Sequence, residues 1–323
     1  MKIAIVTNTT ETIGGVQIFT RDISNILKER GHEVSVISAE SLPIKPEGDI
    51  EEAIGEHFNE LHRKNNYDVV LCNGEMGYAV EHPRAINVFH GNYYGYAMAV
   101  EHLVPKSLTQ ARLIKAELQR ISAEGKYVVT VSNFSTKGLR ESGIEIDKVI
   151  DLSVDTSLFY PQCLTPSNHS LALSRGMDYE KGFDILEELA RRGIKMRLFS
   201  DKEIDSPHIE NMGFVDNRTL NGEYNKAQLL LNPSRFEGGG LTTLEAMACG
   251  CPVIVAPTGY GYDIKDRIPN FVADPDDIIE WLAKREILIN DRDNYSKQAL
   301  EYFHKFHDPQ KFRSEWISLI EGL

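Results

Sequence analysis

Short runs of Val, Ile and Leu alternate along this sequence with longer stretches whose apolar residues recur at helical spacing. The runs fall at residues 3–7, 33–38, 68–73, 85–90, 127–132, 148–152, 170–174, 195–200, 211–215, 228–232, 252–256 and, weakly, 270–273. Runs that are apolar on both faces are typical of strands in parallel sheets, which helices cover on both sides. The sequence therefore predicts an α/β protein built from doubly wound, Rossmann-like parallel sheets.

The length of 323 residues is about twice the common size of a domain, so we expect two domains. Proline and serine residues interrupt the alternation over 154–168, and the first domain is placed at residues 1–153 and the second at 154–307. A helical tail follows at about 308–323. Ligands bind beyond the carboxyl ends of the strands in such sheets, so a central cleft between two facing domains is the expected active site.

Composition narrows the class of ligand. The net charge is −13, from 35 basic and 48 acidic side chains, and binding DNA needs clustered Lys and Arg. We therefore expect no nucleic acid partner, and any phosphate must be held by a local site. The sequence has no apolar run of the roughly 18 residues that a membrane span needs. Its four cysteines fit a reducing cytoplasm better than a disulfide framework, and they form no zinc pattern.

The segment between Glu237 and Glu245 follows a predicted strand and opens a helix. Between the two glutamates lie the residues of a candidate phosphate cradle: Gly238, Gly239, Gly240, Leu241 and Thr242. Glycines let the backbone approach a ligand, and the N–H groups of a helix N-terminus attract anions. The alternative is a capping box, in which Glu245 only satisfies the N–H groups of its own helix.

Two cations, Arg175 and Lys181, follow the first strand of the second half. At the carboxyl end of a strand they can converge on one diphosphate, Arg through its fork and Lys as a point charge. The alternative is that Arg175 pairs with a neighbouring acid and that Lys181 is solvated.

Two weaker signals lie in the first half. Gly14 and Gly15 separate the first strand from its helix and allow a second backbone N–H site, without the spacing of a dinucleotide fingerprint. His90 ends a strand and precedes Gly91, which places it at the mouth of the expected cleft. For His90 a structural and a catalytic role are equally open.

Together these segments resemble the retaining glycosyltransferases of family four, which have the GT-B architecture of two Rossmann-like domains. The resemblance covers nearly the whole chain in the right order. It is carried by Gly14-Gly15, 30–34, Phe89-His90-Gly91, 131–133, 154–161, Arg175 with Lys181-Gly182, and the Glu-Gly-x-Gly-Leu-x-x-Leu-Glu-Ala pattern that begins at Glu237. The last pattern is specific, whereas the others are strong only jointly.

The resemblance implies a retaining, metal-independent hexosyltransferase-type enzyme that uses no cofactor. Its expected donor is a UDP- or GDP-sugar, its first domain is the acceptor side, and its second is the donor domain. The tail helix is expected to pack back on the first domain. A role in polysaccharide or other glycoconjugate biosynthesis follows, with a glycan, a lipid-linked molecule or a small molecule as acceptor.

The resemblance also assigns roles residue by residue. Glu237 is expected to contact hydroxyls of the donor sugar, Glu245 the ribose, and His90 the transferred sugar. The diphosphate would be neutralised by Arg175 and Lys181, with backbone N–H groups at Gly15 and at 240–242. The nucleotide base is expected to bind against the loop formed by Gly213, Phe214 and Val215.

The acceptor is expected to dock within residues 91–124. Three aromatic residues there either stack on a sugar ring or pack within the domain: Tyr93, Tyr94 and Tyr96. Four basic residues of the same region either form a surface that touches anionic lipid or lie on a solvated helix face: Lys106, Arg112, Lys115 and Arg120. Peripheral contact with the inner membrane face therefore stays open.

The chain departs from the family pattern at two positions. Gly239 stands where family members often have Phe, and Thr258-Gly259-Tyr260-Gly261-Tyr262-Asp263 replaces a Gly-Gly-x-x-Glu pattern. Tyr260 or Tyr262 is a candidate for lining the donor pocket. Asp274-Pro275-Asp276 has the form of an Asp-x-Asp metal motif but is interpreted as the start of a helix.

Rival functions remain. One is a GT-B protein that binds a nucleotide sugar without turnover, and another is a phosphorylase or epimerase of the same fold. A nicotinamide oxidoreductase is disfavoured because its glycine fingerprint is missing after the first strand.

Overall fold

The computed structural model describes residues 1–11, 14–44, 46, 48–174 and 179–323. The chain forms two compact units, one made of Met1–Ile150 with Gln310–Leu323 and the other of Asp151–Pro309. Each unit contains one parallel sheet covered by helices, which confirms the predicted α/β class. Each is described in turn.

The first unit holds a six-stranded parallel sheet in the order β2-β1-β3-β4-β5-β6. Its strands are β1 (Lys2–Val6), β2 (Glu33–Ile37), β3 (Val69–Asn73), β4 (Ala85–Phe89), β5 (Tyr127–Thr130) and β6 (Lys148–Val149). Strands β3 and β4 are buried along their whole length, as the apolar runs predicted. The order places the carboxyl ends of β1, β3 and β4 side by side.

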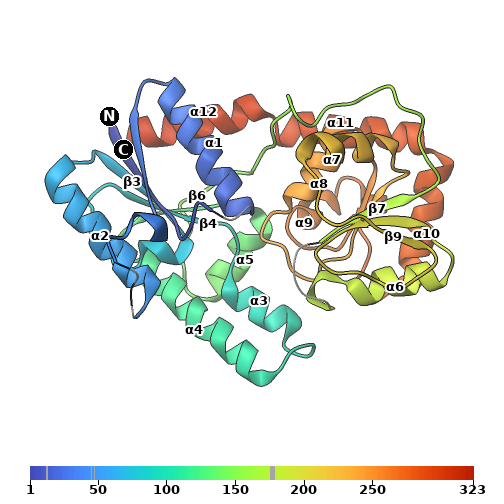
Figure 1. Ribbon diagram of the computed structural model, residues 1–323, viewed down its shortest axis with the longest axis horizontal. Coiled ribbons are helices and arrows are strands. Elements are labelled where there is room, and N and C mark those ends of the chain that lie inside the picture. Colours follow the sequence, from blue (N-terminus) through green and yellow to red (C-terminus); the bar gives the residue numbers. More distant parts are fainter. Residues whose placement is uncertain (12–13, 45, 47, 175–178) are drawn as a thin grey trace. The chain divides into compact units, whose positions relative to one another are not determined.

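The helices of this unit are α1 (Gly15–Glu29), α2 (Ile50–Asn65), α3 (Tyr93–Val100), α4 (Lys106–Ala123), α5 (Asn133–Glu141) and α12 (Pro309–Gly322), with short 3-10 helices η1 (Ala39–Ser41) and η2 (Gly74–Gly77). Figure 1 shows α1 and α12 running beside one another. Their contact is aromatic, because Phe19 of α1 meets Phe312 and Trp316 of α12 at ring-centroid distances of 6.4 and 5.3 Å. Arg313 and Glu29 add an ion pair of 2.6 Å.

The second unit holds a five-stranded parallel sheet in the order β11-β10-β7-β8-β9. Its strands are β7 (Ser170–Leu173), β8 (Met196–Phe199), β9 (Ile209–Asn211), β10 (Leu230–Asn232) and β11 (Val253–Val255). Its helices are α6 (Phe183–Arg191), α7 (Asn217–Lys226), α8 (Leu241–Ala248), α9 (Gly261–Ile264), α10 (Ile278–Asn290) and α11 (Arg292–Phe306), with 3-10 helices η3 (Tyr179–Lys181) and η4 (Pro269–Phe271). The order makes β11, β10 and β7 neighbours.

Two predicted strands differ from the structure. Of the run at 211–215, only Asn211 belongs to a strand, as the last residue of β9. The weak run at 270–273 contributes a single bridge between Val255 and Val272, and η4 occupies its start. Pro269 explains the difference, because a proline has no N–H for a sheet ladder and its fixed φ suits the first turn of a helix.

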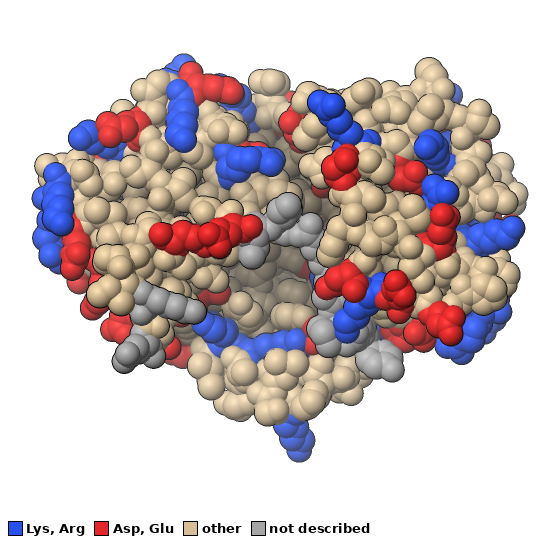
Figure 2. All heavy atoms as spheres, in the orientation of Figure 1, with Lys and Arg blue, Asp and Glu red and all other residues tan. Residues whose placement is uncertain are grey.

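Charge is distributed without segregation over the face shown in Figure 2, where acidic and basic side chains lie interspersed on each unit. Within the described ranges, none of the helices has the length and apolar character needed to cross a membrane. The same residues contain no group of three or more His, Cys, Asp or Glu side chains placed to hold a metal ion.

Candidate functional site

Three loops interlock at the carboxyl edge of the second sheet, after β7, β10 and β11. The N–H of Arg235 donates to the carbonyl of Glu180 (2.9 Å), which joins the first two loops. A Cβ on Gly182 would lie 2.5 Å from the carbonyl oxygen of Pro233, so only glycine permits this approach. The hydroxyl of Thr258 donates to the carbonyl of Ser234 (3.0 Å) and joins the third loop.

This interlocking brings Lys181 and Glu237 together. The Lys181 Nζ lies 2.8 Å from the Glu237 Oε1, and both side chains are about a quarter exposed (28% and 25%). The two residues come from loops 56 positions apart in sequence. The structure thus joins the predicted cation and the predicted sugar-binding carboxylate, whereas Arg175 lies outside the described residues.

The candidate phosphate cradle leads into α8. Gly240 is the N-cap of α8 with φ of +107°, a left-handed conformation that favours glycine. The N-cap is therefore Gly240, which has no side chain, and not Thr242, which the capping-box alternative would place there. The first N–H groups of the helix, at Leu241 and Thr242, are those that an intrahelical ladder leaves unsatisfied. A glycine-lined helix N-terminus of this kind is suited to an anion.

Glu245 lies one turn further along α8 and is 9% exposed. Its Oε2 accepts a hydrogen bond from the hydroxyl of Tyr224 on α7 (2.9 Å). Tyr224 is fully buried, and burial together with the Glu245 carboxylate raises its pKa well above the usual value. The hydroxyl therefore stays protonated and holds Glu245 in a fixed orientation. The predicted contact of Glu245 with a ribose stays a prediction.

Gly239 and Tyr260, the two positions that depart from the family pattern, lie against one another. A Cβ on Gly239 would lie 3.3 Å from both the Tyr260 ring and the Leu152 side chain. Tyr260 is 1% exposed, its N–H donates to the Gly239 carbonyl (2.8 Å), and its hydroxyl accepts from the N–H of Leu152 (2.6 Å). An aromatic ring thus fills the volume beside Gly239 from another loop. Tyr260 therefore packs beneath the phosphate cradle and does not line an open pocket. Tyr262, the other candidate for the donor pocket, is 43% exposed.

The predicted base-binding loop follows β9, the edge strand of the same sheet. Gly213 has φ of +65°, and the ring of Phe214 is 56% exposed. The next residue but one, Asp216, caps α7 by accepting from the N–H of Thr219 (2.8 Å). An exposed aromatic ring on an anchored loop is suited to stacking against a planar base.

Asp274 and Asp276 lie in the turn that precedes α10, as the sequence indicated. The N–H of Asp276 donates to the Asp274 carboxylate (2.9 Å), and Asp277 caps α10. Arg235 binds Asp184 through two hydrogen bonds (2.8 and 2.9 Å) and also reaches Asp276 (3.2 Å). Asp184 and Asp276 therefore anchor the loop that carries Glu237.

In the first unit, Gly14 is the N-cap of α1, which has no side-chain cap among the described residues, and Gly15 is its first residue. His90 follows β4. Its Nε2 lies 2.9 Å from the Asn73 Oδ1, and its ring meets Phe19 edge-on at 4.6 Å. Burial lowers the pKa of His90 from 6.5 to about 4, so the imidazole is neutral near pH 7.

Two of the three candidate acceptor tyrosines are engaged within the unit. The Tyr93 hydroxyl lies 3.3 Å from a Glu75 oxygen, and burial raises the pKa of both groups. The guanidinium of Arg112 lies over the Tyr96 ring at 4.0 Å. Tyr94 is half-buried. Of the three tyrosines, Tyr94 is therefore the best candidate for stacking on a sugar ring of the acceptor.

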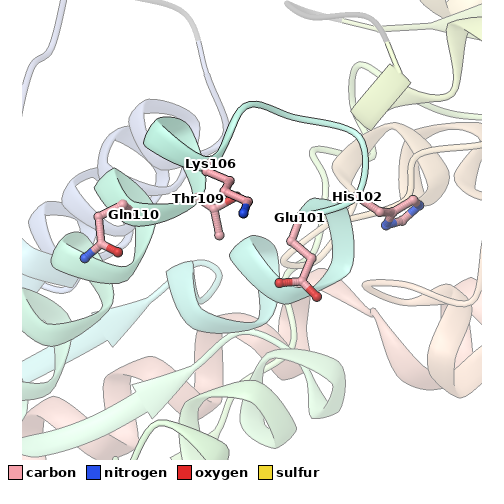
Figure 3. A pocket seen from close by; sticks show the side chains of 5 residues that line it. All are labelled: Glu101, His102, Lys106, Thr109 and Gln110. Carbon is pink, nitrogen blue, oxygen red and sulfur yellow. The ribbon is translucent and has the colours of Figure 1, made fainter.

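The basic residues of α4 do not form one exposed basic surface. Arg112 is 8% exposed, Lys115 pairs with Glu51, and Arg120 pairs with both Glu117 and Glu124. Lys106 instead lines a shallow pocket of about 440 Å³ between the end of α3 and the start of α4. Figure 3 shows the other residues of this pocket, Glu101, His102, Thr109 and Gln110. No motif in the sequence indicated it.

The fold and this edge of the second sheet define an α/β protein of GT-B architecture. Residues 187–291 match the family "Glycosyl transferases group 1", which confirms the resemblance to glycosyltransferases found in the sequence. Over 116 residues the chain is 33% identical to the poly(glycerol-phosphate) alpha-glucosyltransferase of Bacillus subtilis (strain 168). That match covers 33% of this chain and 17% of the relative, so the chain spans less than a fifth of the relative's length.

Solved structures show the same fold over the whole chain. Sucrose-phosphate synthase from Thermosynechococcus elongatus has a TM-score of 0.81 at 17% identity, covering 99% of this chain and 98% of that one. The Anabaena protein HepE, in complex with UDP and glucose, has a TM-score of 0.73 at 17% identity and full coverage of both chains. At these identities the likeness concerns the fold.

Proposed function

We propose that this protein is a retaining, metal-independent glycosyltransferase that moves a sugar from a nucleotide-diphosphate sugar to an acceptor hydroxyl. The observation that carries the proposal is the Lys181–Glu237 pair of 2.8 Å, on the loop that leads into the glycine-capped N-terminus of α8. A cation and exposed N–H groups suit a diphosphate, and a carboxylate suits sugar hydroxyls.

The bond that breaks joins the anomeric carbon of the sugar to the diphosphate, and the bond that forms joins this carbon to the acceptor oxygen. The diphosphate leaves with the bonding electrons, and the proton of the acceptor hydroxyl leaves with it. Charge therefore grows on the leaving group, where Lys181, Arg175 and the N-terminus of α8 would stabilise it. Groups fixed in advance at such positions are worth about 10²–10³ in rate each.

The remaining roles are proposed from the family resemblance. Glu237 would exchange Lys181 for sugar hydroxyls, and Glu245 would accept a hydrogen bond from the ribose. Phe214 would stack on the base, with the backbone of Gly213 and Val215 beside it. On the first unit, Gly15 and His90 would contact the diphosphate and the transferred sugar.

The HepE complex with UDP and glucose makes UDP-glucose the first donor to test. A panel of UDP- and GDP-sugars should raise the melting temperature for the true donor, because a ligand at about 100 times its Kd adds about 2.7 kcal/mol of stability. Transfer should then proceed in the presence of a chelator, and the product should keep the donor's anomeric configuration by NMR. A product of inverted configuration, or activity that needs added manganese, contradicts the proposal.

The same panel separates the rival functions. A donor that binds but is neither transferred nor hydrolysed indicates a nucleotide-sugar binding protein. Turnover that depends on inorganic phosphate indicates a phosphorylase. We also propose a glycan, a lipid-linked molecule or a small molecule as acceptor, in a cytoplasmic reaction of glycoconjugate biosynthesis.

A further inference from the structure

His90 lies at the end of a chain of hydrogen bonds that runs inward through two buried side chains. Its Nε2 lies 2.9 Å from the Asn73 Oδ1, and the Asn73 Nδ2 donates to the Thr20 Oγ1 (2.9 Å). The Thr20 hydroxyl in turn donates to the carbonyl of Val16 on α1 (2.8 Å). Asn73 and Thr20 are 6% and 4% exposed.

The direction of every bond in this chain follows from its inner end. A backbone carbonyl has no proton, so the proton between Thr20 and Val16 must come from the Thr20 hydroxyl. The Thr20 oxygen can then only accept from Asn73, which fixes which end of the amide faces inward. The Asn73 Oδ1 consequently faces His90, and as an acceptor it requires a proton on Nε2. The reverse arrangement would set two acceptors 2.8 Å apart at Val16.

We infer that Asn73 and Thr20 are positioning residues that fix His90 as the Nε2–H tautomer, so that its Nδ1 acts only as a hydrogen-bond acceptor. In a neutral imidazole one nitrogen donates and the other accepts. No hydrogen bond from a described residue to the Nδ1 is seen, and the ring is half-buried. Phe19 holds the plane of the ring from its side.

This assignment has a consequence for the substrate, and there it rests on the proposed function. An Nδ1 that only accepts can bind a sugar hydroxyl that donates. It gives no hydrogen bond to a fluorine or an ether oxygen at the same position. The first unit therefore selects donor sugars that carry a free hydroxyl where His90 meets them.

The tautomer can be measured without any substrate. Long-range proton–nitrogen correlation spectra of the full chain at neutral pH distinguish a protonated from an unprotonated ring nitrogen, and His90→Gln assigns the signal among the 10 histidines. We expect the Nε2–H form alone in the wild type. An Nδ1–H form in the wild type would overturn the assignment.

Two variants test the cause. Thr20→Val removes the inner acceptor, so the Asn73 amide is free to reverse and an Nδ1–H population should appear. Thr136→Val is the matched control, because the Thr136 hydroxyl makes the same bond to a carbonyl four residues earlier (3.0 Å) on another helix. It should leave the His90 spectrum unchanged. An unchanged spectrum in Thr20→Val would show that the chain does not set the tautomer.

Asn73→Leu extends the test to chemistry. With UDP-glucose as the probe, kcat should fall about tenfold while KM changes little, a loss of about 1.4 kcal/mol that is in the range of one hydrogen bond. Unaltered kcat in a variant whose tautomer has changed would overturn the positioning role. If wild-type protein neither binds nor turns over any nucleotide sugar, the proposed function fails, whereas the spectra still decide the tautomer.

Discussion

The two units hold their candidate polar groups in opposite ways. In the second unit, the side chains of Lys181 and Glu237 are about a quarter exposed and form an ion pair with one another. In the first unit, His90 is neutral and depends on a chain of buried neutral partners. If Lys181 binds a diphosphate as proposed, it can exchange the Glu237 carboxylate for the phosphate oxygens. If His90 binds a sugar hydroxyl as proposed, the position of its ring proton must be fixed before the sugar arrives, because it decides whether Nδ1 accepts or donates.

The largest expected effect tests the charged half of this comparison. Lys181→Ala should lower kcat by about 10²–10³, because it removes a positive charge that would stabilise the negative charge growing on the leaving diphosphate. Lys195→Ala, an exposed lysine of the same unit, is the matched control and should keep wild-type kinetics. Melting curves of both variants should match the wild type within about 1 kcal/mol, because partly exposed ion pairs contribute little to stability. Equal kinetics in the two variants contradicts the role of Lys181.

The second prediction separates the two glutamates of the cradle. Glu237→Ala should impair turnover far more than Glu245→Ala, because only Glu237 is expected to touch the sugar. Glu245→Ala should instead lower the free energy of unfolding by about 1–3 kcal/mol, since it leaves the buried hydroxyl of Tyr224 without its acceptor. Chemical denaturation and donor hydrolysis measure the two effects. The reverse ranking would reassign both residues.

The third prediction concerns the packing of the Tyr260 ring against Gly239. Gly239→Phe should destabilise the protein by about 1–3 kcal/mol, because the new ring enters space that Tyr260 fills. Adding Tyr260→Gly should recover part of that loss, giving a coupling energy of about 0.5–3 kcal/mol in a double-mutant cycle. Strictly additive effects would show that the two positions do not share one volume.

The sequence predicts what depends on local pattern. The strand runs were apolar enough to place both sheets, and position after a strand was enough to select Lys181, Glu237 and His90. It failed at 270–273, where a proline opposes a strand that the apolar residues favour. Periodicity cannot detect such a conflict.

The residues that support the site were harder to find. Asn73 and Thr20 are common residue types in ordinary positions, and only the fold brings them within reach of His90. Tyr260 seemed a pocket residue because its ring follows a strand, yet its hydroxyl is bound inside the unit. Partners distant in sequence leave no spacing signal, so three-dimensional structure is required to identify them.

The smallest expected effect tests the neutral half of the comparison through pH. Burial lowers the pKa of His90 from 6.5 in the unfolded chain to about 4 in the folded one. Between these values the unfolded state binds more protons, so this residue's contribution to stability is fully present above pH 6.5 and is lost as the pH falls towards 4. His90→Gln, which does not titrate, should therefore show a shallower loss of stability over that window by denaturant titration. Parallel curves for the two proteins would mean that His90 is not held neutral, and its Nδ1 could then not serve as an acceptor.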